Sequence, residues 1–206
     1  MNISSSPAKN FPATLLVVDM INAMEQPESG ALLEQALPMA GRIANLINAA
    51  RHADIPVVYV NDHFGNWHLD GPRILDHCLY DDVPGRTMTE LLRPRDEDYF
   101  LVKPRKSAFF GTALDPLLED LGTESLILAG ITGDVCVQLT AIDAHIRNFN
   151  LYIPADCVAS LSPERNEQAL GYMHRVLKAD ITPSDQITLA DIRGDNVLTR
   201  LRHALL

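Results

Sequence analysis

The sequence predicts an α/β fold: a doubly wound, mainly parallel sheet with helices on both faces. Short, continuous apolar runs recur along the 206 residues, and such runs are typical of strands that are buried on both faces. Segments with helical spacing of apolar residues separate these runs. Strands that alternate with helices in this way form βαβ units, which place neighbouring strands parallel.

The strands are expected at the apolar runs 15–18, 57–60, 99–102, 125–129 and 151–153, with a short sixth strand at 181–182. The helices are expected at 38–50, 87–92, 112–121, 134–148 and 163–178. The first helix is placed from Pro38 because proline is favoured in a first turn, and Thr112 is the expected N-cap of the third. In the fourth helix, residues at helical spacing predict the face that packs inward: Val135, Leu139, Ile142 and Ile146.

Composition and charge exclude several classes of protein. Hydrophobic residues make up 47% of the chain and charged residues 21%, a balance that can bury a core. The formal net charge is −10, without a basic stripe, so a nucleic-acid partner is not expected. No apolar run approaches the roughly 18 residues that a membrane span needs, and no signal peptide precedes the first strand. We therefore expect a cytoplasmic protein with neither membrane nor nucleic-acid contacts.

Nothing in the sequence divides the chain, so we expect a single domain over residues 1–206, with a core at about 13–183. A C-terminal extension covers about 184–206. This extension leaves two alternatives, a helix at a subunit interface or a segment that packs against its own subunit. Its apolar residues lie at near-helical spacing: Ile192, Val197, Leu198 and Leu201.

Three chemically capable side chains follow three of the expected strands. Asp19 follows the first strand, Lys103 the third and Cys136 the fourth. In doubly wound sheets the carboxyl ends of the strands form the ligand-binding edge, so these side chains are expected to meet there. Each alone has an ordinary structural explanation, such as a turn carboxylate, a solvated amine or a buried thiol. Together they form a nucleophile, a base and a cation.

The chemistry expected of this group is attack by a thiolate on a carbonyl carbon. Cys136 is placed in the first turn of a helix, where the helix dipole favours an anion, and Lys103 adds a positive charge. We therefore expect an apparent thiol pKa well below 8. Asp19 would take the thiol proton and return it to a leaving amine, and backbone N–H groups of the 132–136 turn would hold the oxyanion. The other two cysteines, Cys78 and Cys157, are expected to be inert and reduced, because an odd number at wide spacing is no disulfide framework.

Three stretches of the chain resemble the isochorismatase-like cysteine hydrolases, a group that includes nicotinamidases, N-carbamoylsarcosine amidases, ureidoacrylate-type amidases and isochorismatases. They read VDMIN at 18–22, KPRKSAFFGT at 103–112 and GITGDVCV at 130–137. The resemblance covers about residues 13–183. It implies a six-stranded sheet, an Asp19–Lys103–Cys136 triad and a cis peptide between Ile131 and Thr132. It also implies an oxyanion hole from the backbone N–H groups of Thr132 and Cys136, a small-molecule substrate, and a homo-oligomer, either dimer or tetramer.

Residues around the triad are expected to set the substrate. The nicotinamidases of this group bind a metal through an Asp-x-His motif, and the matching stretch here holds Asp62, His63 and His68 at a different spacing. We therefore expect no metal. The candidate substrate-binding residues are apolar or polar side chains near the strand ends: His63, Phe64, Trp67 and Phe109. Arg105 is a weaker candidate, for contact with a substrate carboxylate. Phe110 is expected in the core.

The sequence thus favours a hydrolase that cleaves a C–N bond of a small amide, ureide or carbamoyl compound through a covalent Cys136 acyl-enzyme, without a cofactor. One alternative in the same fold is hydrolysis of the vinyl ether of isochorismate, which needs an acid but no thiol nucleophile. A second alternative is a non-catalytic protein of the same fold that binds a small molecule.

Overall fold

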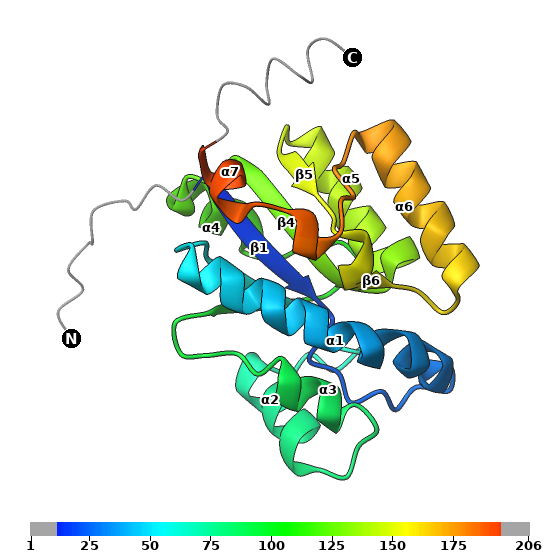
Figure 1. Cartoon of the computed structure of the whole chain (residues 1–206). Coiled ribbons are helices and arrows are strands. Elements are labelled where there is room, and N and C mark those ends of the chain that lie inside the picture. Colours follow the sequence, from blue (N-terminus) through cyan, green and yellow to red (C-terminus); the bar gives the residue numbers. More distant parts are fainter. Residues whose placement is uncertain (1–11, 195–206) are drawn as a thin grey trace, which may run out of the picture.

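Six apolar strands form one parallel sheet, and helices cover both of its faces (Figure 1). The structure, a computed structural model, describes residues 12–194 of the chain. The predicted fold class, a six-stranded and mainly parallel doubly wound sheet, is confirmed. All strands except β6 follow the expected runs: β1 (Ala13–Val18), β2 (Val57–Asp62), β3 (Tyr99–Lys103), β4 (Ser125–Ile131), β5 (Asn150–Tyr152) and β6 (Val158–Ala159).

The strand order is β3-β2-β1-β4-β5, and β6 pairs with the last residues of β4. In register, Leu15 of β1 lies between Val57 of β2 and Ile127 of β4. All residues of β1 and β4 are buried, which is why their sequences are continuous apolar runs rather than alternating ones. The order of the strands changes direction between β1 and β4, and doubly wound sheets bind their ligands at such a point.

The helices divide into two layers, each with its own buried apolar cluster. One layer holds α1 (Ser29–His52), α2 (Gly71–Tyr80), α3 (Arg86–Leu91) and α7 (Leu189–Gly194). The other holds α4 (Leu114–Leu121), α5 (Gln138–Ile146) and α6 (Pro163–Leu177). A five-residue π-helical turn, η1 (Gly133–Val137), precedes α5, and two 3₁₀ turns lie at η2 (Ala155–Cys157) and η3 (Ser184–Gln186).

Two predicted boundaries are wrong. Helix α1 begins at Ser29 rather than Pro38, because Leu32 and Ala36 are also buried and extend its apolar stripe by two turns. Pro38 therefore lies inside the helix, where its lost backbone hydrogen bond is tolerated against this packing. The sixth strand is Val158–Ala159, whereas the segment expected at 181–182 contributes only a single bridge between Asp180 and Tyr152.

Thr112 also differs from its predicted role. Helix α4 begins at Leu114 after the N-cap Ala113, which makes no side-chain cap. Thr112 still caps in effect, since its hydroxyl accepts a hydrogen bond from the N–H of Leu114 at 3.1 Å. The threonine satisfies one helix N–H from just outside the first turn.

The inward face predicted for α5 is wrong. Leu139 and Ile146 are 42% and 68% exposed, and Ile142 is only partly buried. The residues that the helix buries are instead small: Thr140, Ala141 and Ala144. Of the predicted face, Leu139 and Ile146 thus lie away from the core, whereas Val135 and Ile142 are partly buried and pack against it.

The C-terminal extension packs back on its own subunit as far as the structure describes it. Leu189 and Ile192 of α7 are buried in the same apolar cluster as α1. Val197, Leu198 and Leu201 lie outside the described residues. No helix within residues 12–194 is long and apolar enough to span a bilayer.

Candidate active site

The carboxylate of Asp19 stands at the end of β1, on a backbone turn that most residues avoid. Its φ is 55°, in the left-handed region, which Asp tolerates better than bulky residues. The turn is fixed because Asp19 N–H donates to the carbonyl of Val60 and Asn61 Nδ2 donates to the carbonyl of Ile21 at 2.7 Å. Gly130 lies beside it in β4, and a Cβ there would clash with the carbonyl oxygen of Val18. β1 and β4 therefore approach closely at the edge that carries the site.

Lys103 brings the three predicted catalytic side chains together. It is the last residue of β3, and its side chain is completely buried. Its Nζ lies 2.9 Å from Asp19 Oδ2 and donates to Cys136 Sγ at 3.6 Å. The side chains at the ends of three different strands therefore meet, because the buried ammonium group of Lys103 contacts both Asp19 and Cys136.

Asp62 is a second carboxylate of this site, and sequence reasoning missed its place. Its Oδ2 lies 3.6 Å from Lys103 Nζ and 3.3 Å from Lys106 Nζ, and its N–H donates to Asp19 Oδ1 at 2.7 Å. In the sequence, Asp62 stands out only as a possible metal ligand. The signal that points to the site is its position: it ends β2 directly opposite Lys103 in the strand register.

The carboxylates and the amine have pKa values that follow from burial and from one another. Burial raises the pKa of Asp19, although Lys103 acts in the opposite direction. Burial also acts to raise the pKa of Asp62, but Lys103, the N–H of Phe64 and Lys106 outweigh it and lower that pKa. For Lys103, burial acts downward, and the surrounding Asp19, Cys136 and Asp62 outweigh it and raise the pKa. The shifts of Lys103 and Asp62 favour an ammonium next to an ionised Asp62, whereas the shift of Asp19 makes that carboxylate the readier proton acceptor.

The thiol of Cys136 does not have the low pKa expected from the sequence. Burial, and after it the charge of Asp19, raise the pKa of Cys136 to about 12, although Lys103 acts to lower it. The reason is that the residue is only 7% exposed and faces a carboxylate as well as an amine. The site therefore holds a thiol next to a carboxylate of raised pKa, an arrangement suited to proton transfer during attack.

The turn that carries Cys136 is supported from behind by α6. The peptide bond between Ile131 and Thr132 is cis, and the carbonyl of Thr132 accepts hydrogen bonds from the N–H groups of Val135 and Val137, both at 3.1 Å. Ser160 Oγ accepts from the N–H of Asp134 at 3.2 Å and donates to Asn166 Oδ1 at 3.1 Å. These contacts hold the start of η1 against the sheet.

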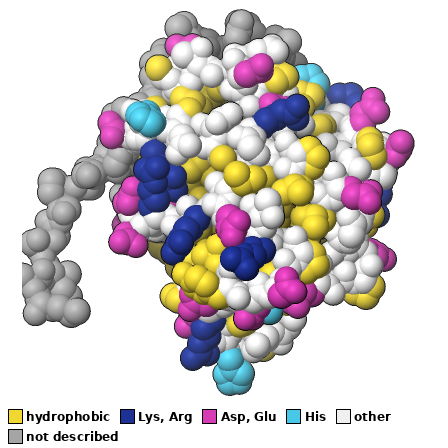
Figure 2. Space-filling view, turned by 60° about the horizontal axis from the view of Figure 1, so that its bottom comes forward, with side chains coloured by type: hydrophobic (Ala, Val, Ile, Leu, Met, Phe, Trp, Pro, Cys, Tyr) yellow, Lys and Arg dark blue, Asp and Glu magenta, His cyan; other side chains and the backbone are white. Residues whose placement is uncertain are grey.

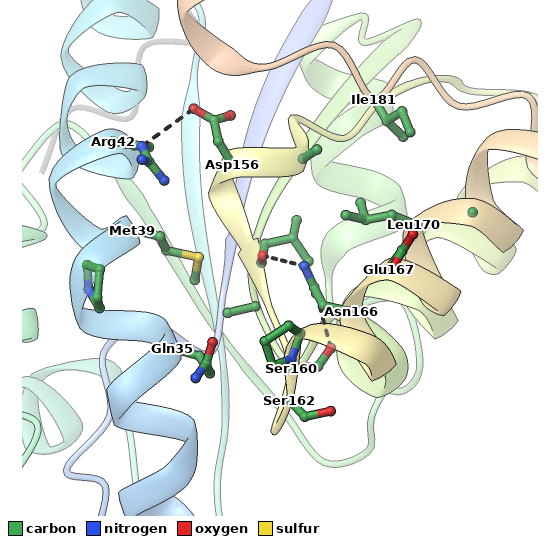
Figure 3. A pocket seen from close by; sticks show the side chains of 16 residues that line it. Gln35, Met39, Arg42, Asp156, Ser160, Ser162, Asn166, Glu167, Leu170 and Ile181 are labelled. Atoms are coloured by element: carbon green, nitrogen blue, oxygen red, sulfur yellow. Dashed lines mark hydrogen bonds and ion pairs between the residues drawn. The ribbon is translucent and has the colours of Figure 1, made fainter.

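A cavity among the described residues lies on the other side of this support. It has a volume of about 560 Å³ and lies between α1 and α6, beside η2 and β6 (Figure 3). Met39 and Arg42 line it from α1, and Asn166 and Leu170 line it from α6. None of the predicted site residues lines it, so it is separate from the group formed by Asp19, Lys103 and Cys136.

The predicted substrate-binding residues occupy two different environments. Phe64 and Trp67 are 44% and 72% exposed, and the Trp67 ring contacts the ring of His63 with centroids 4.6 Å apart. Phe109 is buried and stacks on Phe149, so packing accounts for its side chain. Phe110, expected in the core, is 62% exposed. On the face turned forward in Figure 2, hydrophobic side chains gather centrally among charged side chains of both signs.

The residues after β2 do not fit a metal centre. Asp62 is engaged by two lysines, and Nδ1 of His63 accepts a hydrogen bond from the N–H of Gly65 at 2.8 Å. Across residues 12–194, no three His, Cys, Asp or Glu side chains gather as a metal site requires. Arg105 turns its guanidinium to the carbonyl of Pro104, so the structure does not bring it to the catalytic group.

Comparisons with known proteins point to one family. A model of the isochorismatase domain matches residues 13–186. The uncharacterized isochorismatase family protein YaaI of Bacillus subtilis is 41% identical over 173 residues, which cover 84% of this chain and 94% of that protein. The ureidoacrylate amidohydrolase RutB of Methylobacterium radiotolerans is 29% identical over 206 residues, covering 87% of this chain and 75% of that protein. The crystal structure of N-carbamoylsarcosine amidase from Thermoplasma acidophilum matches with a TM-score of 0.64 and 33% identity, covering 85% of this chain and 98% of that one.

Proposed function

Because the chain belongs to the isochorismatase family, we propose that it is a cysteine hydrolase that cleaves a C–N bond of a small amide, ureide or carbamoyl compound. The observation that carries this proposal is the buried contact of Lys103 Nζ with both Asp19 and Cys136. Two of its relatives are named as an amidohydrolase and an amidase, and their names specify ureidoacrylate and N-carbamoylsarcosine. Those names support a substrate that carries a carbamoyl group.

The reaction begins with attack of Cys136 Sγ on the carbonyl carbon of the substrate. Because the pKa of the thiol is raised, its proton moves to the Asp19 carboxylate as the C–S bond forms, and Lys103 keeps the remaining charges paired. The carbonyl oxygen becomes an oxyanion, which the backbone N–H groups of Thr132 and Cys136 would stabilise.

Collapse of this intermediate breaks the C–N bond and leaves a thioester on Cys136. Asp19 gives its proton to the leaving nitrogen, which departs as ammonia or an amine. A water molecule then attacks the thioester and passes one proton to Asp19. The C–S bond breaks, the acid leaves, and the proton returns from Asp19 to the thiolate. Atoms and charges balance over the cycle without a cofactor.

His63 is the polar side chain that we assign to substrate binding. Its Nδ1 accepts a hydrogen bond from Gly65, so the neutral ring carries its proton on Nε2. That Nε2–H is buried and has no acceptor among the described residues, a state that costs about 1–3 kcal/mol when nothing compensates it. A substrate carbonyl or carboxylate would supply the acceptor, with Trp67 and Phe64 beside it.

The test is a panel of amides, ureides and carbamoyl compounds, with ammonia release as the measurement. We expect activity on at least one carbamoyl compound, loss of that activity in Cys136→Ala, and retention in the matched variants Cys78→Ala and Cys157→Ala. The two control cysteines are also buried but lie away from Lys103. Hydrolysis that survives Cys136→Ala would refute the covalent mechanism, and a wild-type protein inactive on the whole panel would refute the substrate class.

A further inference from the structure

A second carboxylate, Asp62, is built into the site but has no step of its own in the proposed reaction. Its Oδ2 lies 3.6 Å from Lys103 Nζ, and its backbone N–H donates to Asp19 Oδ1 at 2.7 Å. Its side chain is only 14% exposed, so water screens its charge little. A carboxylate in this place changes the electrostatic field that the reacting groups experience.

The carboxylate of Asp62 is held by contacts that do not depend on the protonation of Asp19. Asp62 pairs with Lys103 in the register of β2 and β3, so the sheet fixes the distance between the two residues. Asp62 Oδ1 accepts a hydrogen bond from the N–H of Phe64 at 2.8 Å, and Oδ2 lies 3.3 Å from Lys106 Nζ. Asp62 can therefore keep its place when a proton arrives on Asp19.

The proposed reaction removes the nearest counter-ion of Lys103 at each attack. Asp19 Oδ2 lies 2.9 Å from Lys103 Nζ in the resting site, and Asp19 becomes a neutral acid when it takes the proton of Cys136. The side chain of Lys103 is completely buried, and an ammonium without a counter-ion is strongly disfavoured in such a place. Asp62 is the carboxylate that remains beside it.

We propose that Asp62 is a positioning residue, which keeps the Lys103 ammonium paired while Asp19 carries the proton from the thiol to the leaving nitrogen. This inference rests on the proposed function. The two carboxylates divide the work, since Asp62 stays ionised through the cycle and Asp19 alternates between carboxylate and acid. The pKa directions agree: burial acts to raise the pKa of Asp62, but Lys103 and other neighbours outweigh it, whereas burial raises the pKa of Asp19.

Asp62→Asn tests this role because it removes the charge and keeps the shape. Lys103 then has Asp19 as its single carboxylate, so Asp19 accepts the thiol proton less readily. On a substrate that the wild type hydrolyses, we expect kcat to fall about 10–10²-fold and KM to stay within about twofold. The acid limb of kcat/KM, which reports the ionisation of Asp19, should move to lower pH by about one unit. A merely structural role would lower kcat without this movement, and an unmoved limb would overturn the proposal.

Alkylation of Cys136 tests the charge of Asp62 without any substrate. Asp62→Asn should speed the reaction of Cys136 with iodoacetamide at pH 7.5 by about tenfold, since the loss of a negative charge favours the thiolate. Lys106→Met is the matched control: it breaks the same contact with Asp62 but removes a positive charge that acts to lower the pKa of Cys136. It should slow the alkylation. Changes in the same direction would show that the contact acts through structure, and would overturn the proposal.

A second pair of variants keeps the proposal falsifiable if Asp62→Asn fails to fold. Asp62→Glu and Asp62→Gln have side chains of equal length and differ only in charge. We expect the glutamate variant to keep an acid limb and an alkylation rate near those of the wild type, and the glutamine variant to show both shifts; equal values would contradict the role of the charge. If no compound of the panel is hydrolysed, the proposed function fails, and the alkylation rates alone decide whether Asp62 acts through its charge.

Discussion

Removal of the buried amine of Lys103 should destabilise the fold and not only abolish activity. In Lys103→Met, a side chain of similar length loses its charge, and Asp19 keeps the N–H of Asp62 and the thiol of Cys136 as partners but no cation. The two carboxylates of Asp19 and Asp62, which lie 2.9 Å and 3.6 Å from the amine in the native site, then repel each other without a cation between them.

The expected magnitude follows from the burial of the group. Breaking a buried ion pair by removal of one partner costs about 3–5 kcal/mol, because the other charge stays buried and uncompensated. The loss should be largest at neutral pH and smaller near pH 5. Burial already raises the pKa of Asp19, and without Lys103 that pKa rises further. Because the folded-state pKa of this acid lies above its unfolded value, the charged form is the penalised one, and uptake of a proton on acidification relieves the penalty.

Urea unfolding of Lys103→Met at pH 7 and pH 5 measures both effects, with the free energy of unfolding obtained by linear extrapolation. Lys106→Met is the matched control: it also removes an amine next to Asp62, but its side chain is 58% exposed, so we expect a loss of less than about 1 kcal/mol. The reasoning is refuted if the two variants lose the same free energy at pH 7, or if the loss in Lys103→Met does not shrink at pH 5.

Three further predictions concern the thiol, one histidine and one glycine. Alkylation of Cys136 by iodoacetamide should keep rising with pH beyond pH 8, because its pKa is raised to about 12. Asp19→Asn should speed this alkylation at pH 7.5 while it lowers kcat by about 10²–10⁴-fold; a plateau below pH 8 in the wild type would contradict the raised pKa. His77→Gln should lower the free energy of unfolding by less than about 1 kcal/mol at pH 6 and leave it unchanged at pH 9. Glu25 and Asp81 raise the pKa of His77, so its contribution is present below the unfolded pKa and is lost as pH rises through the folded pKa; a loss that is equal at both pH values would argue against this. Gly85→Ala should lower both stability and kcat, because its Cβ would clash with the carbonyl oxygen of Asn22, whereas Gly41→Ala, with open space around it, should lower neither. Full activity in Gly85→Ala would show that the loop after β1 tolerates displacement.

The strands and the position of the site could be predicted because both depend on local signals. A strand buried on both faces must be apolar throughout, as β1 and β4 are, and the carboxyl ends of parallel strands share one edge. That rule alone brings Asp19 and Lys103 to the same place. Their proximity can therefore be predicted without knowing how the loops between the strands fold.

The errors arise where an apolar pattern has more than one possible partner. Periodicity shows that Leu139, Ile142 and Ile146 lie on one face of a helix, but it does not show whether the sheet or another molecule covers that face. Likewise, Cys136 at the beginning of a helix suggests an activated thiol, yet burial and the charge of Asp19, which raise the pKa of that thiol, depend on how three strand ends close over the group. Those effects act through space and leave no mark on the local sequence.

The close contact of Gly85 with the loop after β1 has a consequence for protein engineering. Gly85 N–H donates to the carbonyl of Ala23 at 2.9 Å, so the segment that carries α2 and α3 packs against the loop that begins with Asp19. This segment also begins with Phe64 and Trp67, which belong to the proposed substrate-binding residues and are the positions that a designer would exchange first. A graft of this region from a relative therefore has to retain the glycine and its distance from Asn22, since otherwise the graft would also displace Asp19.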